Sequence, residues 1–216
     1  EWLWYSIRRR LLDADLEALR DHMHGRVLEI GSGRRGRRGY FQPPIGRVET
    51  WIYLDLESKR EPHIRGDVEY LCLKDGVFDT IVCLEVLEHV THPQVAMKEM
   101  HRVLNDGVLI LSTPFLHGVH EPLDYWRFTE HGLRYLLTAS GFKIRYVKRQ
   151  GAALSVVVNI LKYIIYLMPS GWLRYLLAFT AYLPLMGLFR LDRWIVQRLP
   201  VLRKFPAGYL VYAVKS

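Results

Sequence analysis

The chain has 216 residues, of which 50% are hydrophobic and 24% charged, and its formal net charge is +8. That length suits a single α/β domain with an elaboration, and the chain can bury a substantial core. The opening 20 residues contain Arg8, Arg9 and Arg10 but no apolar run of the kind that a secretory signal needs. Cys72 and Cys83 lie in apolar stretches, where we expect reduced, buried side chains. These features argue against a secreted protein and favour the cytoplasm.

The positive charge is concentrated toward the C-terminus. Residues 151–216 carry eight Lys or Arg and the single acid Asp192, and so account for +7 of the +8. A region that is both basic and apolar favours an anionic membrane surface over nucleic acid as a partner. We therefore expect no nucleic-acid partner and place the protein at the cytoplasmic face of a membrane.

Hydrophobic periodicity predicts an amphipathic helix over residues 6–23, within an N-terminal segment that ends at residue 24. Short apolar runs between turn signals predict strands at Arg26–Ile30, Val48–Leu54, Phe78–Leu84 and Val108–Ser112. A helix is expected over Pro93–Leu104, with proline in its first turn. Strands that alternate with helices indicate a parallel, doubly wound sheet.

The chain continues with an expected helix over Thr129–Ser140 and an alternating strand over Phe142–Lys148. A final strand is expected at Tyr209–Val214. Two strongly apolar stretches of helical length, Ala152–Met168 and Trp172–Phe189, separate these strands. The predicted organisation is thus a core over residues 25–150, an apolar and basic insertion over residues 151–205, and a last core strand within residues 206–216.

A glycine-rich turn follows the first predicted strand. Gly31 and Gly33 have no Cβ and would let a ligand approach the backbone closely. With Gly36 they form a G-x-G-x-x-G pattern, which alone is a weak signal. Asp55 ends the next strand, where a carboxylate can accept hydrogen bonds from ribose hydroxyls. The pairing is compatible with either NAD or S-adenosylmethionine (SAM).

Four segments resemble, in order and at suitable spacing, the successive motifs of class I SAM-dependent methyltransferases, most closely the type-11 group. They are residues 27–33, Gly66–Glu69, Phe78–Val90 and Arg102–Pro114. The resemblance covers about residues 25–150 and the final strand. It implies SAM as the cofactor and a Rossmann-like, seven-stranded, mostly parallel sheet whose last strand is antiparallel, with the apolar helical insertion between the last two strands.

The resemblance also implies roles for individual residues. Glu29, Gly31 and Gly33 would line the methionine moiety together with Ser32, and Asp55 with its neighbour Leu56 would lie at the ribose. Asp67 and Val68 would contact the adenine, and Leu84 and Glu85 would lie beneath the sulfonium.

One departure from the family pattern is Arg35, which stands where a third glycine is usual. It belongs to a run with Arg34, Arg37 and Arg38 that soon meets Pro43 and Pro44, so the helix after the loop is expected to be short or distorted. The arginines are interpreted either as a solvated loop or as contacts to a phosphate-bearing substrate or lipid headgroup.

The acceptor side of the site is expected between residues 113 and 129, after the Val108–Ser112 strand. His120 is the predicted general base, since an imidazole titrates near neutral pH and can take a hydroxyl proton. Asp124 could orient it, while Tyr125 and Arg127 could hold the acceptor. Alternatively, Asp124 and Arg127 form a structural ion pair. His89 is expected to shape the floor of the site, and the histidines show no ligand-like spacing, so no metal site is predicted.

Each apolar stretch of the insertion is marginal for crossing a bilayer, which needs about 20 residues. The flanking strands belong to one sheet, so the chain must cross an even number of times or not at all. Lys162, Arg174 and Pro184 favour an in-plane or re-entrant arrangement over a spanning hairpin. The other interpretation is a soluble lid or a dimer interface.

The sequence thus predicts a membrane-associated SAM-dependent methyltransferase that methylates a hydroxyl of a glycan or a lipid-linked saccharide precursor. Three alternatives remain open. They are a soluble small-molecule methyltransferase with a helical lid, an NAD-dependent oxidoreductase, and a catalytically silent, methyltransferase-like membrane scaffold.

Overall fold

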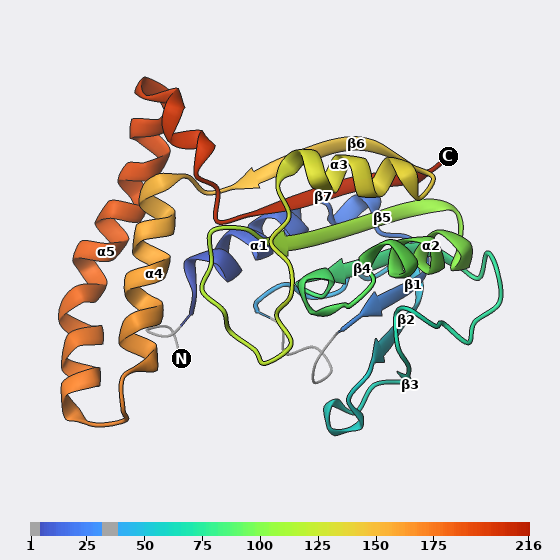
Figure 1. Cartoon of the computed structure of the whole chain (residues 1–216), viewed down its shortest axis with the longest axis horizontal. Coiled ribbons are helices and arrows are strands. Elements are labelled where there is room, and N and C mark those ends of the chain that lie inside the picture. The colour runs from blue at the N-terminus through green and yellow to red at the C-terminus, as the bar shows by residue number, and fades with distance from the viewer. Residues whose placement is uncertain (1–4, 32–38) are drawn as a thin grey trace.

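A computed structural model of the chain describes residues 5–31 and 39–216 (Figure 1). The strands are β1 (Gly25–Ile30), β2 (Val48–Asp55), β3 (Ile64–Arg65), β4 (Phe78–Leu84), β5 (Leu104–Pro114), β6 (Phe142–Gln150) and β7 (Gly208–Lys215). The helices are α1 (Ile7–Ala18), α2 (Pro93–Val103), α3 (Glu130–Ala139), α4 (Ala153–Leu167) and α5 (Trp172–Arg198). Short 3₁₀ turns are η1 (Arg20–His22), η2 (Ser58–Arg60), η3 (Leu87–His89) and η4 (Pro200–Lys204).

The strands form one seven-stranded sheet in the order β3-β2-β1-β4-β5-β7-β6. All neighbouring pairs are parallel except those of β7, which runs antiparallel to both β5 and β6. The predicted fold class is therefore confirmed. The strand order reverses between β1 and β4, and in open α/β sheets ligands bind at the carboxyl ends of the strands beside such a reversal.

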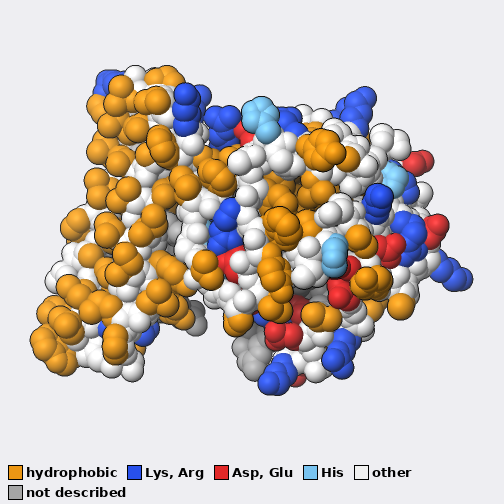
Figure 2. Space-filling model, in the orientation of Figure 1, with side chains coloured by type: hydrophobic (Ala, Val, Ile, Leu, Met, Phe, Trp, Pro, Cys, Tyr) orange, Lys and Arg blue, Asp and Glu red, His pale blue; other side chains and the backbone are white. Residues whose placement is uncertain are grey.

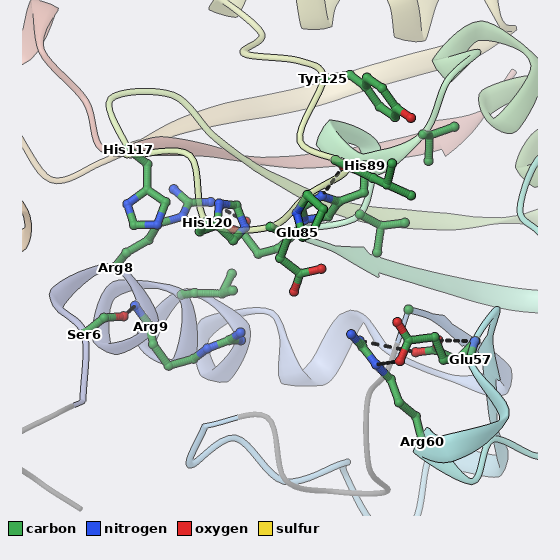
Figure 3. A pocket seen from close by; sticks show the side chains of 18 of the residues that line it. Ser6, Arg8, Arg9, Glu57, Arg60, Glu85, His89, His117, His120 and Tyr125 are labelled. Carbon is green, nitrogen blue, oxygen red and sulfur yellow. Dashed lines mark hydrogen bonds and ion pairs between the residues drawn. The ribbon is translucent and has the colours of Figure 1, made fainter. Parts of the chain in front are cut away.

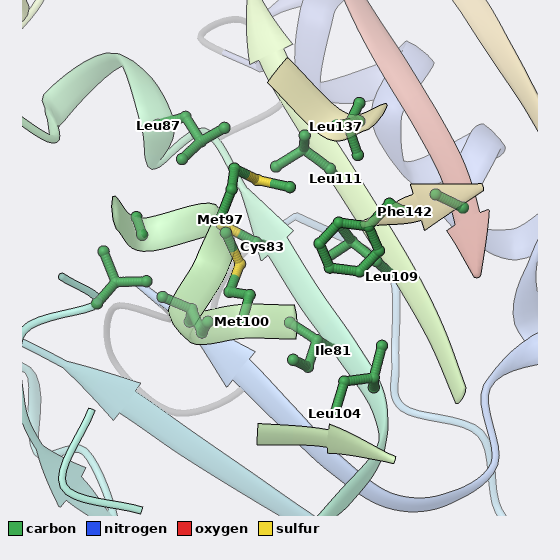
Figure 4. Close-up of a cluster of buried hydrophobic side chains, with 14 of the residues drawn as sticks. Ile81, Cys83, Leu87, Met97, Met100, Leu104, Leu109, Leu111, Leu137 and Phe142 are labelled. Atoms are coloured by element: carbon green, nitrogen blue, oxygen red, sulfur yellow. The ribbon is translucent and has the colours of Figure 1, made fainter. Parts of the chain in front are cut away.

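Helices cover both faces of the sheet. One face packs against α2 and α3 through a buried cluster that includes Cys83, Met97, Leu137 and Phe142 (Figure 4). The opposite face packs against α1 through Leu12, Leu16 and the alternate residues of β1 and β4. Successive side chains of a strand point to opposite faces, so each buried strand contributes to both clusters.

Most predicted elements occur with small shifts at their ends, but the first helix ends at Ala18 and β5 is longer than expected. Thr129 begins α3 by accepting a hydrogen bond from the Gly132 N–H at 3.1 Å, and Pro93 occupies the first turn of α2. The two-residue strand β3 was not predicted, because a pair of residues carries no readable periodicity. The expectation that both cysteines are buried is wrong for Cys72, which is exposed, and right for Cys83.

The insertion is a hairpin of α4 and α5 that projects from the end of the sheet (Figure 1). The second helix is longer than predicted, since it continues through Pro184 to Arg198 and has 27 residues. At a rise of about 1.5 Å per residue it is roughly 40 Å long. By length and composition, α5 is the one described helix able to cross a membrane.

The hairpin is anchored to the core at its base. Val158 of α4 packs against Ile7 of α1 and Leu185 of α5. Asp192, which is 2% exposed, accepts hydrogen bonds from the N–H groups of Ala152 and Leu154 at 3.0 and 3.1 Å. These are donors at the start of α4, so the lone acid of the insertion caps that helix from α5.

Candidate active site

A cavity of about 960 Å³ lies at the carboxyl ends of β1, β2 and β4 and extends to the α4–α5 hairpin (Figure 3). One end is lined by residues of the predicted cofactor site: Gly31, Asp55, Leu56, Asp67, Val68 and Glu85. The other end is lined by α4 and α5, including Asn159, Lys162, Tyr163, Tyr182 and Leu185. His89, His117, His120 and Tyr125 lie along it between these ends. A single cavity therefore joins the predicted cofactor site to the predicted acceptor site.

At the cofactor end, Gly31 adopts a left-handed backbone conformation with φ of 66°, and a Cβ there would collide with Val86. Glycine is therefore required at this turn. The Asp55 carboxylate is 5% exposed and accepts a hydrogen bond from the Glu57 N–H at 3.0 Å. Asp67 accepts one from the Glu69 N–H at 2.9 Å. Both carboxylates are thus held by their own loops at the cavity wall.

Two predicted cofactor residues do not line the cavity. The Glu29 carboxylate accepts a hydrogen bond from the Trp51 indole at 2.8 Å, and Leu84 packs in the cluster beneath α1. The physical reason is strand alternation, which turns both side chains away from the cavity. Ser32, Gly33 and the arginines of residues 34–38 lie outside the described residues.

Glu85 is held by a buried ion pair. It adopts φ of 56°, a conformation that a non-glycine residue rarely takes, and its carboxylate binds the Arg8 guanidinium through two hydrogen bonds. The Ser112 hydroxyl donates a further bond at 2.6 Å. Burial alone would raise the pKa of Glu85, but the charge of Arg8 outweighs this and lowers it below the ordinary value. Arg8 thereby ties α1 to the floor of the cavity.

Asp124 and Arg127 form the structural ion pair that was the alternative interpretation. The Asp124 side chain is fully buried and binds both terminal nitrogens of Arg127. Arg127 also donates to the Gly118 carbonyl at 3.2 Å and does not line the cavity. Hydrogen bonding from Arg127 lowers the pKa of Asp124 to about 2, so this carboxylate is ionised. The predicted role of Arg127 in holding the acceptor is therefore not supported, because its donors are used within the loop.

His120 and Tyr125 lie where the sequence places the acceptor. The Nδ1 atom of His120 is 3.1 Å from the Asp124 carboxylate without a hydrogen bond between them, and the His120 backbone N–H donates to that carboxylate at 3.3 Å. The backbone N–H of Tyr125 donates to the Glu88 carbonyl at 2.7 Å, which fixes its loop over the cavity. Figure 3 shows His117, His120 and His89 following one another along the cavity, and both neighbouring rings have centroids about 5 Å from that of His120.

Several polar groups in this region were not predicted. His117 contacts Asn159 of α4 at 3.1 Å, and burial, with the nearby charge of Arg8, lowers its pKa to about 4. Lys162 donates to the Tyr5 carbonyl at 2.9 Å, and burial lowers its pKa to about 8. The Glu88 side chain is fully buried, and burial followed by the charge of Glu85 raises its pKa well above the ordinary value. The one sequence signal for the burial of Glu88 is that it lies within an otherwise largely apolar segment.

Part of the chain matches a known domain family. A methyltransferase domain family, of type 11, matches residues 49–112. The mitochondrial ubiquinone biosynthesis O-methyltransferase of Saccharomyces cerevisiae is 40% identical over an alignment 133 residues long, which covers 52% of this chain and 41% of that relative. The chain thus spans less than half the length of this relative.

Solved structures share the fold. A SAM-dependent methyltransferase from Archaeoglobus fulgidus superposes with a TM-score of 0.57 at 16% identity, covering 96% of this chain and 94% of that one. The [4+2]-cyclase SpnF superposes with a TM-score of 0.60 at 14% identity, covering 94% and 81%. A fold shared by a methyltransferase and a cyclase does not by itself specify a reaction.

Proposed function

We propose that the chain transfers a methyl group from SAM to a hydroxyl of a glycan or a lipid-linked saccharide precursor. Residues 49–112 match the type-11 methyltransferase domain, and the fold is shared with a SAM-dependent methyltransferase. The proposed location is the cytoplasmic face of a membrane. The observation that carries the proposal is the single cavity that runs from Gly31 and Asp55 to the His120 region and the hairpin.

The residues at one end of the cavity fit SAM. The left-handed turn at Gly31 leaves the backbone open beside Asp55, whose carboxylate can accept hydrogen bonds from two ribose hydroxyls. Asp67 and Val68 offer a polar and an apolar wall for an adenine ring. When bound, SAM supplies a methyl group already activated by its sulfonium.

The chain's own task is to align the acceptor, exclude water and remove a proton. His120 is the proposed proton acceptor, because it lines the cavity while its Nδ1 atom faces the ionised Asp124. Asp124 is a positioning residue in this scheme. Tyr125 and the neutral His117 border the same space and could contact the acceptor. The ubiquinone relative is named as an O-methyltransferase, which supports oxygen as the acceptor atom.

The surface of the hairpin supports a membrane location. Figure 2 shows hydrophobic side chains covering α4 and α5, and many of them are exposed, including Trp172, Phe179 and Leu183. Arg190, Arg193 and Arg198 of α5 are exposed beside Trp194, a combination typical of the membrane interface. Contact with an anionic bilayer would remove this apolar area from water.

An in-plane arrangement fits better than a spanning one. The 15 residues of α4 measure roughly 22 Å, shorter than the hydrocarbon core of about 30 Å. One face of α4 is also buried against α1. Were α5 to cross alone, β6 and β7 would lie on opposite sides of the membrane, although they are neighbours in one sheet. The second candidate is a soluble enzyme whose hairpin acts as a lid, and it is favoured by the hairpin residues that line the cavity.

Calorimetry with S-adenosylhomocysteine (SAH) and with NADH tests the cofactor. We expect SAH to bind and NADH not to bind. Asp55→Ala should weaken SAH binding by about 3 kcal/mol, roughly 150-fold, because two hydrogen bonds to a charged acceptor are lost. Asp75→Ala, which removes an exposed partner of Arg102, is the matched control. Tight binding of NADH without SAH would instead support the oxidoreductase.

The acceptor is tested by incubating the protein with SAM and membrane lipid extracts, and separately with soluble metabolites. A glycolipid that gains about 14 Da, the mass of one CH₂, supports the proposal. A product found among soluble metabolites alone supports the lid. Bound SAH without any methylated product from either source supports the silent scaffold.

A further inference from the structure

Three side chains that can bind a metal meet beside the cavity, although one of them is distant in the sequence from the other two. Glu88 and His89 belong to η3, which follows β4, and His120 lies in the loop after β5. One ligand atom from each of the three lies within 4.8 Å of those of the other two. No metal site was predicted from the sequence, because the 30 residues between His89 and His120 hide any regular spacing.

The Glu88 carboxyl group has no polar partner that accounts for its burial. Its side chain is 0% exposed, and neither oxygen has a hydrogen-bond partner among the residues that the structure describes. The nearest cationic candidate is the Nε2 atom of His89, which is 3.8 Å from Oε1. An unpaired buried carboxyl costs free energy, and an unmodified protein rarely keeps one without a function or a bound ion.

His89 is oriented as a metal ligand usually is, and His120 turns its Nδ1 atom toward a carboxylate, although no hydrogen bond joins them. The Nδ1 atom of His89 is 2.8 Å from the Leu123 carbonyl oxygen, and Nδ1 of His120 is 3.1 Å from the Asp124 carboxylate. A ligating histidine commonly turns one ring nitrogen to a carbonyl or carboxylate, which fixes the tautomer and leaves the other nitrogen for the metal. In both residues Nε2 is the nitrogen left available.

We propose that Glu88, His89 and His120 bind one divalent transition-metal cation. Two imidazoles and one carboxylate suit Zn²⁺, Mn²⁺, Fe²⁺ or Co²⁺ rather than Ca²⁺ or Mg²⁺, which prefer all-oxygen sites. His89 and His120 line the cavity, so the remaining coordination positions face the space assigned to the acceptor.

This inference rests on the proposed function and specifies how the hydroxyl is activated. A bound cation would accept the acceptor oxygen as a ligand and lower the pKa of its hydroxyl, so that the proton leaves to solvent water. The oxygen then forms its bond to the methyl carbon as the carbon–sulfur bond breaks. In this arrangement His120 is a ligand, whereas in the metal-free protein it would take the proton itself.

Titration of the chelator-treated, dialysed full chain with Co²⁺ tests the site, because bound Co²⁺ absorbs in the visible range. We expect one Co²⁺ per chain. Glu88→Gln, His89→Ala and His120→Ala should each weaken Co²⁺ binding by more than about 100-fold, because loss of a partner that only supports a ligand already costs about 10- to 100-fold. His131→Ala, an exposed histidine on α3, should bind Co²⁺ as the unmodified protein does. Circular dichroism and SAH binding establish that each variant is folded.

Co²⁺ binding that is absent, or unchanged in all three ligand variants, would overturn the inference. Methyl transfer measured in the chelated protein separates this result from failure of the proposed function. Loss of transfer on chelation and its recovery with added metal supports the cation. Full transfer without metal, with SAH bound normally, refutes the cation and leaves direct proton transfer to His120. Absence of SAH binding would refute the proposed function itself.

Discussion

Replacement of Arg8 by methionine should destabilise the fold more than any surface substitution. Arg8 is 5% exposed and binds both oxygens of Glu85, and it also donates to the Ala207 carbonyl at 3.1 Å. Removing one partner of a buried ion pair leaves an uncompensated charge and typically costs about 3–5 kcal/mol. At roughly 2–4 °C per kcal/mol for a chain of this size, the melting temperature should fall by about 6–20 °C.

The loss should depend on pH in a defined direction. The folded protein lowers the pKa of Glu85, so the pair stabilises the fold above the unfolded value near 4.5, and this stabilisation is lost as pH falls through the folded pKa. In Arg8→Met, burial without the cation should raise the Glu85 pKa instead. The difference between variant and unmodified protein should therefore be largest near pH 7 and shrink below about pH 4.5.

Urea unfolding followed by circular dichroism at pH 7 and pH 4 measures both effects. Glu85→Gln and the double variant complete a cycle, and the double variant should lose less than the sum of the two single losses. Arg20→Met, which breaks the exposed pair with Glu17, is the control and should leave stability nearly unchanged, because solvent screens exposed pairs. A loss at Arg8 no larger than at Arg20, or one independent of pH, would refute the reasoning.

Three further variants test other parts of the structure. Asp192→Ala removes the acceptor for donors at the start of α4 and should cost about 2–4 kcal/mol, with faster amide exchange in α4 than in α2 as the readout. Thr129→Ala removes the cap of α3 and should cost about 1 kcal/mol in urea unfolding. The double variant Arg190→Gln with Arg193→Gln should bind vesicles containing about 30% anionic lipid more weakly by about 2 kcal/mol, roughly 30-fold. Binding is measured by sedimentation with the vesicles. The control, Lys143→Gln with Arg145→Gln on β6, should bind them as the unmodified protein does.

Strand periodicity predicted most of the fold, because buried parallel strands read as continuous apolar runs between turn residues. Phe78–Leu84 occurs with the predicted bounds. The strand β5 is longer than predicted at both ends, since it begins at Leu104, before the exposed Asn105 and Asp106, and continues to Pro114. The apolar stretch that contains Pro184 was expected to end at Phe189, yet α5 continues to Arg198. Local propensity does not reveal the hairpin packing and the Asp192 cap that hold the two helices together.

The site was less predictable than the fold, because its residues meet through loops. Asp55 lines the cavity as its place after β2 predicts, since carboxyl ends of parallel strands share one edge. The family motif predicts Glu29 at the methionine moiety of SAM, but the Glu29 carboxylate accepts a hydrogen bond from the Trp51 indole on the neighbouring strand. No periodicity connects Glu88 to His120, and only the fold brings them together.

The place of the insertion follows from the topology of the sheet. Since β7 is antiparallel to β5 and to β6, β6 ends and β7 begins at the edge where the parallel strands have their carboxyl ends. A segment inserted between β6 and β7 must therefore emerge beside the ligand crevice, whatever its sequence. An apolar hairpin at this place can contact a membrane and also border the acceptor end of the cavity, because the hairpin and the cavity lie at the same end of the strands. An acceptor that is itself anchored in a membrane would then reach His120 along α4 without leaving the lipid surface, which is why we favour a lipid-linked acceptor over a freely diffusing one.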